Sequence, residues 1–460
     1  MNNFRNFIST LLLKTSSILK SKGAFKTYSS IICILISLII GLIFLICMDP
    51  VNAFPEFGNL ITGGLSFGSV NFFAILAKTA PLVCCGLSIV FANKTGMFNI
   101  GVAGQYTIGV LGSLMFALQF KCPWYVCILM SMVFGAIWAA IPGLLKAFCN
   151  VSEVISGIML NWIALFFTNY SFQTYLNGCV DLSQGSKTYA IEKVNQSALI
   201  PDWGLSSATG GYFTISIIIA IIVAILVWFI MKKTTLGFQL KASGLNKDAT
   251  KYAGIKEKRN IIISMSISGA LAALGASLYY LSGLEEWSVQ ASTALPQVPW
   301  NGIVVAFVGQ LSPIGTIFAS MFTTLISHGS RFMLQTSFPA EIGDFITGLI
   351  VYLSGLTNLA LILVNKYLTK KKEKQLQDGG SLQTIVQETN GDNNEGEINS
   401  GVTSSDEIIY FNNHENESIS QGISQEVKSN SVSEIVLEEK TSSDEVKNLN
   451  CEEKNEKGGN

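Results

Sequence analysis

Long runs of apolar residues with few or no charges recur along the first 365 positions and constrain the fold more than any other feature of the sequence. The run at 31–48, IICILISLIIGLIFLICM, is close to the ~20 apolar residues that an α-helix needs to cross a bilayer. A soluble core hides one or two such runs but not nine, so the sequence predicts an all-α, polytopic membrane protein. The nine runs lie at 31–48, 70–92, 98–119, 124–147, 154–170, 212–231, 261–283, 302–327 and 343–365. A hydrophobic content of 49%, a charged content of 13% and a mean hydropathy of +0.43 agree with this class.

The distribution of Lys and Arg predicts the orientation of these spans, because basic residues concentrate in cytoplasmic loops. Residues 1–30 carry five basic residues and no acidic one, so we expect a basic cytoplasmic N-terminus followed by an uncleaved first span. The segment 232–260 holds eight basic and two acidic residues and is also predicted to be cytoplasmic. The loops at 49–69, at 173–211 and around Glu285 lack such an excess and are predicted to be extracellular.

The number of crossings depends on the run at 302–327, which Gly309, Pro313 and Gly315 interrupt. It forms either two short crossings or a re-entrant hairpin. Since both termini are predicted to be cytoplasmic, the crossings must be even in number, and about eight to ten spans fit. We therefore expect a transmembrane domain over 31–365 in the cell membrane.

The composition changes abruptly near Glu373 to Asn, Ser, Glu and Gln with few aromatic residues. Such a segment cannot bury enough apolar surface to offset the entropy of ordering its backbone. Residues 366–460 are predicted to be a disordered, acidic cytoplasmic tail, either a solvated extension or a binding segment for a partner.

Polar residues inside the predicted spans should face protein neighbours or a water-lined path. Asn99 lies where a helix would begin and is predicted to cap it by accepting a backbone N–H. Gln105 shares a face with Gly101, Gly109 and Gly112, where small residues let another helix approach closely. Asn99 and Gln105 therefore either join helices or line a translocation path.

A second polar stripe occurs in the run that begins near residue 154. Glu153, Ser156, Gly157 and Asn161 share one helical face, with Glu153 near the cytoplasmic end and in contact with water. Asn161 lies deeper and forms either an inter-helix hydrogen bond or part of a path. Ser268, Ala272 and Ala276 in a later span have the spacing typical of close helix packing.

Several function classes are disfavoured by what these spans carry. Apart from Lys78, no ionisable residue lies deep in a span, whereas ion-coupled carriers usually place acidic or basic groups there. Nine scattered cysteines and two histidines offer no metal-binding spacing, and no catalytic pair for an intramembrane protease occurs. No catalytic residue, metal or cofactor is expected in this chain. The sequence instead favours a transport subunit whose energy comes from another polypeptide, with a secondary carrier or a membrane enzyme as weaker alternatives.

The basic segment 232–260 has more structure than a simple basic loop. Gly237, Gly244 and Gly254 are predicted to interrupt short helices, and Asn246 occupies a capping position. A short helix on a glycine-hinged loop suits docking into a partner. A solvated basic loop at the membrane surface is the alternative.

Five motifs, in order across roughly 80–365, resemble permease subunits of ABC importers in the branch for nucleosides and simple sugars. TTLGFQLKASGLNKDATKYAGI (234–255) resembles the coupling loop, and FNIGVAGQ (98–105) resembles the Asn-Ile-Gly-Ala-Glu-Gly-Gln signature. SEVISGIMLNWIAL (152–165), SISGALAALGASLYYLSG (266–283) and GIVVAFVGQLSPIG (302–315) resemble further blocks of that family. The sequence departs from the family at Ala103, where a Glu is usual, at Lys247, where a Pro is usual, and at PQVPWNG (296–302).

The resemblance implies a transport subunit that works with an ATP-binding cassette subunit, a second permease subunit, homologous or identical, and an extracellular substrate-binding lipoprotein. The cassette would use the ATP. This chain itself would contact membrane lipid and would bind no nucleic acid. The expected coupling residues are Gly237, Lys241, Gly244, Asn246, Tyr252 and Gly254. Asn99, Gln105 and Asn161 are the candidates for the substrate path, nucleosides are the first expectation for the substrate, and simple sugars are the alternative.

Overall fold

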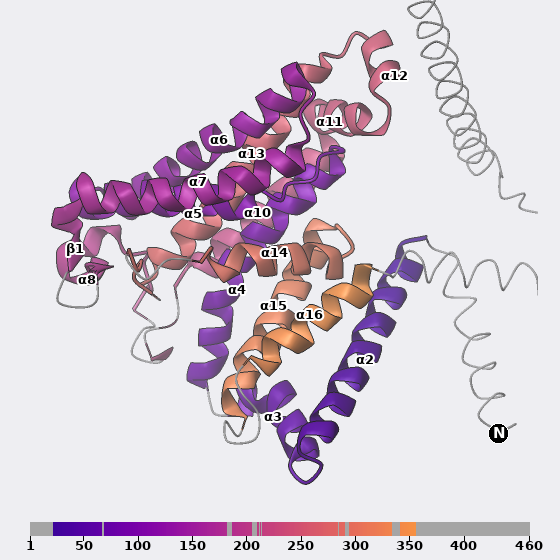
Figure 1. Cartoon of the computed structure of the whole chain (residues 1–460), viewed down its shortest axis with the longest axis vertical. Helices are drawn as coiled ribbons and strands as arrows, with labels where there is room; N and C mark the ends of the chain where they lie inside the picture. The colour runs from indigo at the N-terminus through magenta and orange to yellow at the C-terminus, as the bar shows by residue number, and fades with distance from the viewer. Residues whose placement is uncertain are drawn as a thin grey trace, which may run out of the picture. The chain divides into compact units, whose positions relative to one another are not determined.

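A computed structural model describes residues 22–355 except 67–68, 182–185, 205–208, 211, 213, 284, 290–293 and 334–340. These described residues are almost wholly helical (Figure 1). Six of the helices are long and apolar enough to cross a membrane, which confirms the predicted all-α, multi-pass membrane fold. They are Val70–Lys94, Val102–Gln119, Trp124–Cys149, Glu153–Thr174, Ser216–Lys233 and Glu257–Tyr280. The cytoplasmic position of the termini stays a prediction, and the predicted tail lies outside the described residues.

Three helices form the centre of the fold: α4 (Ser69–Lys94), α5 (Val102–Leu114) and α13 (Glu257–Tyr280). A five-residue π-helix, η1 (Met115–Gln119), continues α5. Within their most apolar stretches, 83% of α4, 83% of the α5–η1 span and 72% of α13 are buried. These spans therefore contact protein on most sides, which allows them to carry polar groups.

An outer layer consists of α6 (Trp124–Cys149), α7 (Glu153–Thr174) and α10 (Ser216–Lys233). Only 28–39% of their most apolar stretches is buried, and their outward side chains are large and apolar, as at Leu129, Phe166 and Phe229. Since water would not accommodate such a surface, these faces contact lipid.

Small residues allow the outer and central helices to approach closely. A Cβ atom built on Gly135 of α6 would lie 2.6 Å from the carbonyl oxygen of Gly269 in α13, and one on Gly109 of α5 would lie 2.6 Å from Cα of Ala273. Ser268, Ala272 and Ala276 are completely buried. The close packing predicted for this span and for the glycines of α5 is confirmed.

The interrupted run at 302–327 forms two helices, α14 (Gln297–Val308) and α15 (Pro313–Gly329). Between them Gln310 and Leu311 have positive φ angles of 54° and 51°, so the chain turns sharply. The 12 residues of α14 extend about 18 Å, too short for a bilayer core of about 30 Å. This length favours a re-entrant pair over two full crossings. A short helix η5 (Ser330–Phe332) continues α15, and α16 (Ile342–Gly355) follows.

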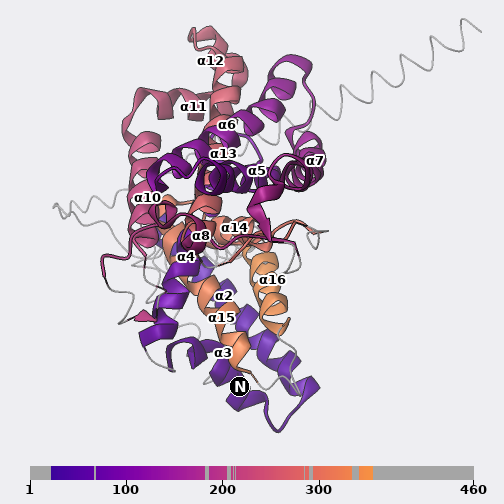
Figure 2. The same cartoon turned by 90° about the vertical axis from the view of Figure 1, so that its left-hand side faces the viewer.

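The remaining helices lie at opposite ends of the structure in space. At one end, α11 (Thr235–Leu245) and α12 (Lys247–Tyr252) follow α10; at the other, α3 (Ala53–Ser66) connects α2 (Lys22–Met48) to α4 (Figures 1 and 2). Within the described residues, α2 also includes the nine residues that precede the predicted span.

A connecting segment of short elements lies between α7 and α10. It contains η2 (Asn177–Cys179), the antiparallel pair of β1 (Val180–Asp181) and β2 (Lys187–Thr188), α8 (Ile191–Val194) and η4 (Gln196–Ala198). Thr188 and Trp287 exchange two hydrogen bonds: the Thr188 N–H donates to the Trp287 carbonyl at 2.9 Å, and the Trp287 N–H donates to Thr188 Oγ1 at 3.0 Å. These bonds fasten the segment to the chain after α13.

Candidate functional site

Asn99 and Gln105 form a reciprocal amide pair at the start of α5. Asn99 Nδ2 donates to Gln105 Oε1 at 2.7 Å, and Gln105 Nε2 donates to Asn99 Oδ1 at 2.9 Å. The prediction that Asn99 caps the helix is wrong, because α5 begins three residues later, with Gly101 as its N-cap, and the Asn99 oxygen is engaged by Gln105 instead.

Two serines extend this pair to the neighbouring helices. Asn99 Nδ2 also donates to Ser268 Oγ of α13 at 2.7 Å, and Ser268 Oγ donates to the carbonyl oxygen of Ser88 in α4 at 2.8 Å. Asn99 and Gln105 are 2% and 1% exposed. This amide cluster, comprising Ser88, Asn99, Gln105 and Ser268, joins α4, α5 and α13, and its groups satisfy one another away from water.

Asn161 of α7 supplies the cap that α5 lacks from its own sequence. Its Oδ1 accepts a hydrogen bond from the backbone N–H of Gly104 at 2.7 Å, and its Nδ2 donates to the carbonyl oxygen of Ile100 at 3.1 Å. The N–H of Gly104 lies in the first turn of α5, where backbone donors have no partner within the helix. Gly104 permits the contact, since a Cβ there would lie 2.9 Å from Cα of Asn161.

The three candidates for the substrate path are thus brought together around the start of α5. In this conformation each is buried and hydrogen-bonded between helices. None of them lines the polar cavity around Lys78. The geometry supports the helix-joining role, and the path role stays a prediction.

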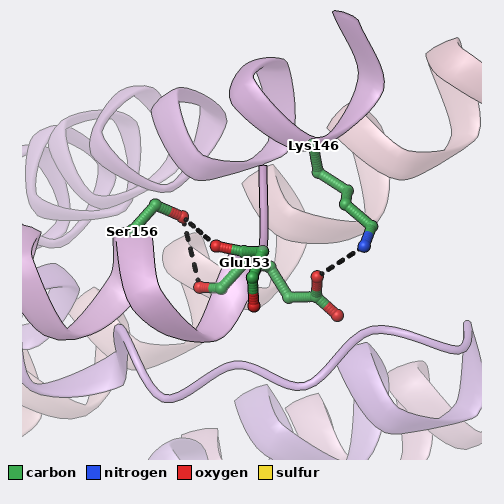
Figure 3. A network of polar contacts seen from close by, with 4 residues as sticks. Lys146, Glu153 and Ser156 are labelled. Carbon is green, nitrogen blue, oxygen red and sulfur yellow. Dashed lines mark hydrogen bonds and ion pairs between the residues drawn. The ribbon is translucent and has the colours of Figure 1, made fainter. Parts of the chain in front are cut away.

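An ion pair connects the end of α6 to the start of α7 (Figure 3). Lys146 Nζ lies 3.1 Å from Glu153 Oε2, and Ser156 Oγ donates to the carbonyl oxygens of Ser152 and Glu153. The Glu153 side chain is 13% exposed and so keeps some of its predicted contact with water, but the turn at Asn150, with φ of 53°, also brings it to Lys146, a partner that the sequence analysis did not name. Its position in the first turn of α7 also suits a negative charge.

The segment between α10 and α13 consists of two capped helices. Thr234 Oγ1 accepts a hydrogen bond from the Gly237 N–H at 3.1 Å to cap α11, and Asn246 Oδ1 accepts one from the Ala249 N–H at 3.0 Å to cap α12. The capping position predicted for Asn246 is confirmed.

The glycines of this segment differ from the prediction that all three interrupt helices. Gly237 and Gly244 lie inside α11, while Gly254, with φ of 74°, lies just after the end of α12. A Cβ on Gly244 would lie 2.5 Å from the carbonyl carbon of Thr95 and 2.6 Å from the Gly96 nitrogen, so this glycine lets α11 rest directly on the turn after α4. Gly244 is thus explained by the close approach of α11 to the backbone at Thr95 and Gly96, a contact that a single sequence does not show.

Large apolar side chains project from this segment. Phe238 and Leu245 of α11 and Tyr252 of α12 are 69%, 88% and 94% exposed, and Lys241 is half-buried. We call Phe238, Leu245 and Tyr252 the apical surface. Below it, Asn260 Nδ2 of α13 donates to Ser243 Oγ at 2.8 Å, and the hydroxyl groups of Thr95 and Ser264 are hydrogen-bonded. The apical surface therefore rests on the ends of α4 and α13.

The sequence singled out Lys78 as a deep charge but could not show its surroundings. In the structure it lines a cavity together with Arg331, which is more than 250 positions away along the chain. No pattern within either local segment indicates this meeting.

A centre of buried, amide-linked helices, a lipid-facing outer layer and a rigidly seated segment between two spans define an integral membrane transport subunit. Residues 71–355 match the family model described as "Branched-chain amino acid transport system / permease component". The chain belongs to this permease family, as its motifs predicted.

Individual relatives are similar over most of their length. The nucleoside ABC transporter permease protein NupB of Lactococcus lactis is 33% identical over 335 residues, covering 71% of this chain and 90% of the relative. The guanosine ABC transporter permease protein NupP of Bacillus subtilis is 32% identical, covering 62% and 81%. The glucose ABC transporter permease protein TsgB13 of Haloferax volcanii is 26% identical, covering 70% and 85%. These relatives are membrane transport components rather than enzymes.

Proposed function

We propose that this chain is the permease subunit of an ATP-driven importer for nucleosides. The observation that carries the proposal is the similarity, at 32–33% identity, to permeases named for nucleosides and guanosine over 81–90% of their lengths. The glucose permease, at 26% identity, makes a simple sugar the second candidate. A stand-alone secondary carrier is disfavoured because the relatives are subunits of ABC transporters.

The proposed assembly contains an ATP-binding cassette subunit, a second permease subunit and an extracellular substrate-binding lipoprotein. ATP is hydrolysed by the cassette, and this chain holds no cofactor of its own. The decisive test of substrate is reconstitution of the whole complex in proteoliposomes, followed by uptake of labelled nucleoside with unlabelled nucleoside or glucose as competitor. Inhibition by glucose alone would refute the nucleoside assignment.

We also propose that the apical surface binds the ATP-binding cassette. Its three side chains are exposed on a segment with an excess of lysine, and the aromatic ones are of the type that dominates binding energy at interfaces. Gly237, Gly244 and Gly254 shape the segment, Asn246 caps it, and Lys241 lies on α11 between the exposed side chains. A force on this surface reaches α4 and α13 through the contacts at Gly244 and Asn260.

The coupling proposal is tested by the double variant Leu245→Ala and Tyr252→Ala. Both side chains are nearly free of contacts within the chain, so we expect normal membrane insertion but roughly a tenfold loss of uptake and of substrate-stimulated ATP hydrolysis. Tyr125→Ala, at an exposed position on α6, is the matched control and should leave uptake unchanged. Substitution of Gly244 is less informative, because any side chain there collides with the backbone at Thr95. Normal uptake by the double variant would refute the proposal that the apical surface binds the ATP-binding cassette.

A further inference from the structure

A cavity of about 230 Å³ lies among α4, α13, α14, α15, η5 and α16, and no residue of the amide cluster lines it. Its lining is strongly polar, with Lys78 partly buried and Arg331 and Asp344 exposed. The residues that matter for the argument are Lys78, Asn301, Thr324, His328, Arg331 and Asp344.

Two of these residues carry polar atoms that the surrounding protein leaves unsatisfied. Thr324 is 6% exposed, and its hydroxyl oxygen has no hydrogen-bond partner among the described residues. The same holds for both ring nitrogens of His328, whose ring packs against Phe332. Buried polar atoms are nearly always hydrogen-bonded, because an unmade bond in an apolar interior destabilises the fold. At this polar cavity, these groups are therefore available to a ligand that supplies the missing partners.

The charges around the cavity point in the same direction. Lys78 lies within α4, and neither it nor Arg331 or Asp344 has an ion-pair partner within 4 Å in the described part of the chain. Tyr279, a further lining residue, donates its hydroxyl hydrogen to Glu285 at 2.7 Å. Ionisable groups inside a membrane protein are costly and commonly mark the route of a polar substrate.

The mixture of groups selects the chemical class of the ligand. Lys78 and Arg331 offer hydrogen-bond donors, Asp344 offers acceptors, and Asn301 and Thr324 offer both. A phosphate would be attracted by the two cations but repelled by the carboxylates of Asp344 and nearby Glu285. A neutral molecule with carbonyl oxygens, ring nitrogens and N–H or hydroxyl groups matches all of them. The volume is slightly below the usual range of small-molecule sites, as suits a compact molecule.

We propose that this cavity is a transit site for a nucleoside inside the permease subunit. The proposal rests on the nucleoside importer function proposed above and deepens it by assigning substrate contacts to Lys78, Asn301, Thr324, Arg331 and Asp344. Tyr279 lies at the end of α13 that the charge distribution predicts to be extracellular. The nucleoside would therefore meet this site soon after it leaves the binding protein.

The test uses Thr324→Val and, separately, Lys78→Gln in the complete transporter reconstituted in proteoliposomes. Thr324→Val keeps the shape and removes only the unpartnered hydroxyl, so we expect an unchanged or higher melting temperature together with about a 3- to 10-fold lower maximal uptake of nucleoside. Lys78→Gln removes a partly buried charge and should behave in the same way, with a changed ratio of purine to pyrimidine nucleoside uptake. If Thr324 and Lys78 have only structural roles, uptake should fall only in variants whose melting temperature also falls.

Thr316→Val on the same helix is the matched control. Its hydroxyl donates to the Ser312 carbonyl oxygen at 2.8 Å and does not line the cavity, so uptake should stay within about twofold. Unchanged uptake rate and unchanged nucleoside preference in both Thr324→Val and Lys78→Gln would overturn the transit site while leaving the importer function intact. Failure of the unsubstituted complex to carry any nucleoside would instead refute the proposed function.

Discussion

The amide pair of Asn99 and Gln105 allows a quantitative test of whether these residues join helices or line a path. Gln105→Leu retains the size of the side chain but removes two hydrogen bonds, of 2.7 and 2.9 Å, and leaves Asn99 Oδ1 buried without a partner. With ~0.6–1.5 kcal/mol per bond, and the added cost of the unpaired oxygen, the expected loss is about 2–3 kcal/mol. Asn99→Leu also removes the 2.7 Å bond to Ser268, so its loss should be similar or larger.

The double variant distinguishes this pair from two independent residues. When both amides are replaced, no amide is left unpaired, and the loss should be close to that of the more damaging single variant. The interaction energy from the cycle should therefore be about as large as the smaller single loss, about 2–3 kcal/mol. The assay is the melting temperature of the assembled complex in nanodiscs, where each single variant should fall by about 4–8 °C. Uptake is measured on the same preparations.

Two results would refute this reasoning. Losses that simply add in the double variant would show that the two amides do not depend on each other. Unchanged melting temperatures together with lost uptake, or with a shifted preference between nucleoside and sugar, would assign Asn99 and Gln105 to the path.

Two further predictions concern packing and the tail. Gly269→Ala should lower the free energy of unfolding by about 1–3 kcal/mol, and with it the melting temperature, because the added methyl group meets Ala139 and the Gly135 carbonyl. Gly348→Ala, at a position with open space, is the control and should leave the melting temperature unchanged. Equal effects of the two substitutions would contradict the packing argument. Truncation after Lys374 should leave uptake, normalised to the amount of protein in the membrane, within about twofold of that of the full-length chain. The reason is that the removed segment lacks the apolar residues needed to pack against the rest of the protein. Loss of assembly would instead identify the tail as a docking element.

Local signals in the sequence predicted the spans and several details within them. The apolar length of six of the nine runs indicates a membrane-spanning helix, and the small residues around Ser268 indicate a face for close packing. The cap at Asn246 was predictable because its partner, the Ala249 N–H, lies three positions away. Each of these features depends on residues within a few turns of one another.

Contacts across the fold were not predictable from the same signals. Asn99 resembles a helix cap, yet its oxygen pairs with Gln105 and its nitrogen reaches Ser268, 169 positions away. The true cap comes from Asn161, in another helix. Likewise, the sequence indicated Lys78 as the one charge deep in a span but gave no sign that folding brings Arg331 to the same cavity. Side-chain partners of this kind depend on how helices pack, which periodicity alone does not determine.

The close approach of Gly244 to the turn after α4 has a mechanical consequence. The helix α4 runs without interruption from Lys78, at the cavity, to Lys94, next to the seat of α11, a length of about 24 Å. A displacement of the apical surface therefore acts on one end of a rod whose other end forms a wall of the cavity. Pro81 lies three residues beyond Lys78 and cannot donate the backbone bond that stiffens a helix there. Pro81 is thus a weak point of α4 beside the cavity, so under the proposed coupling a displacement at the far end would bend the helix next to the proposed substrate contacts.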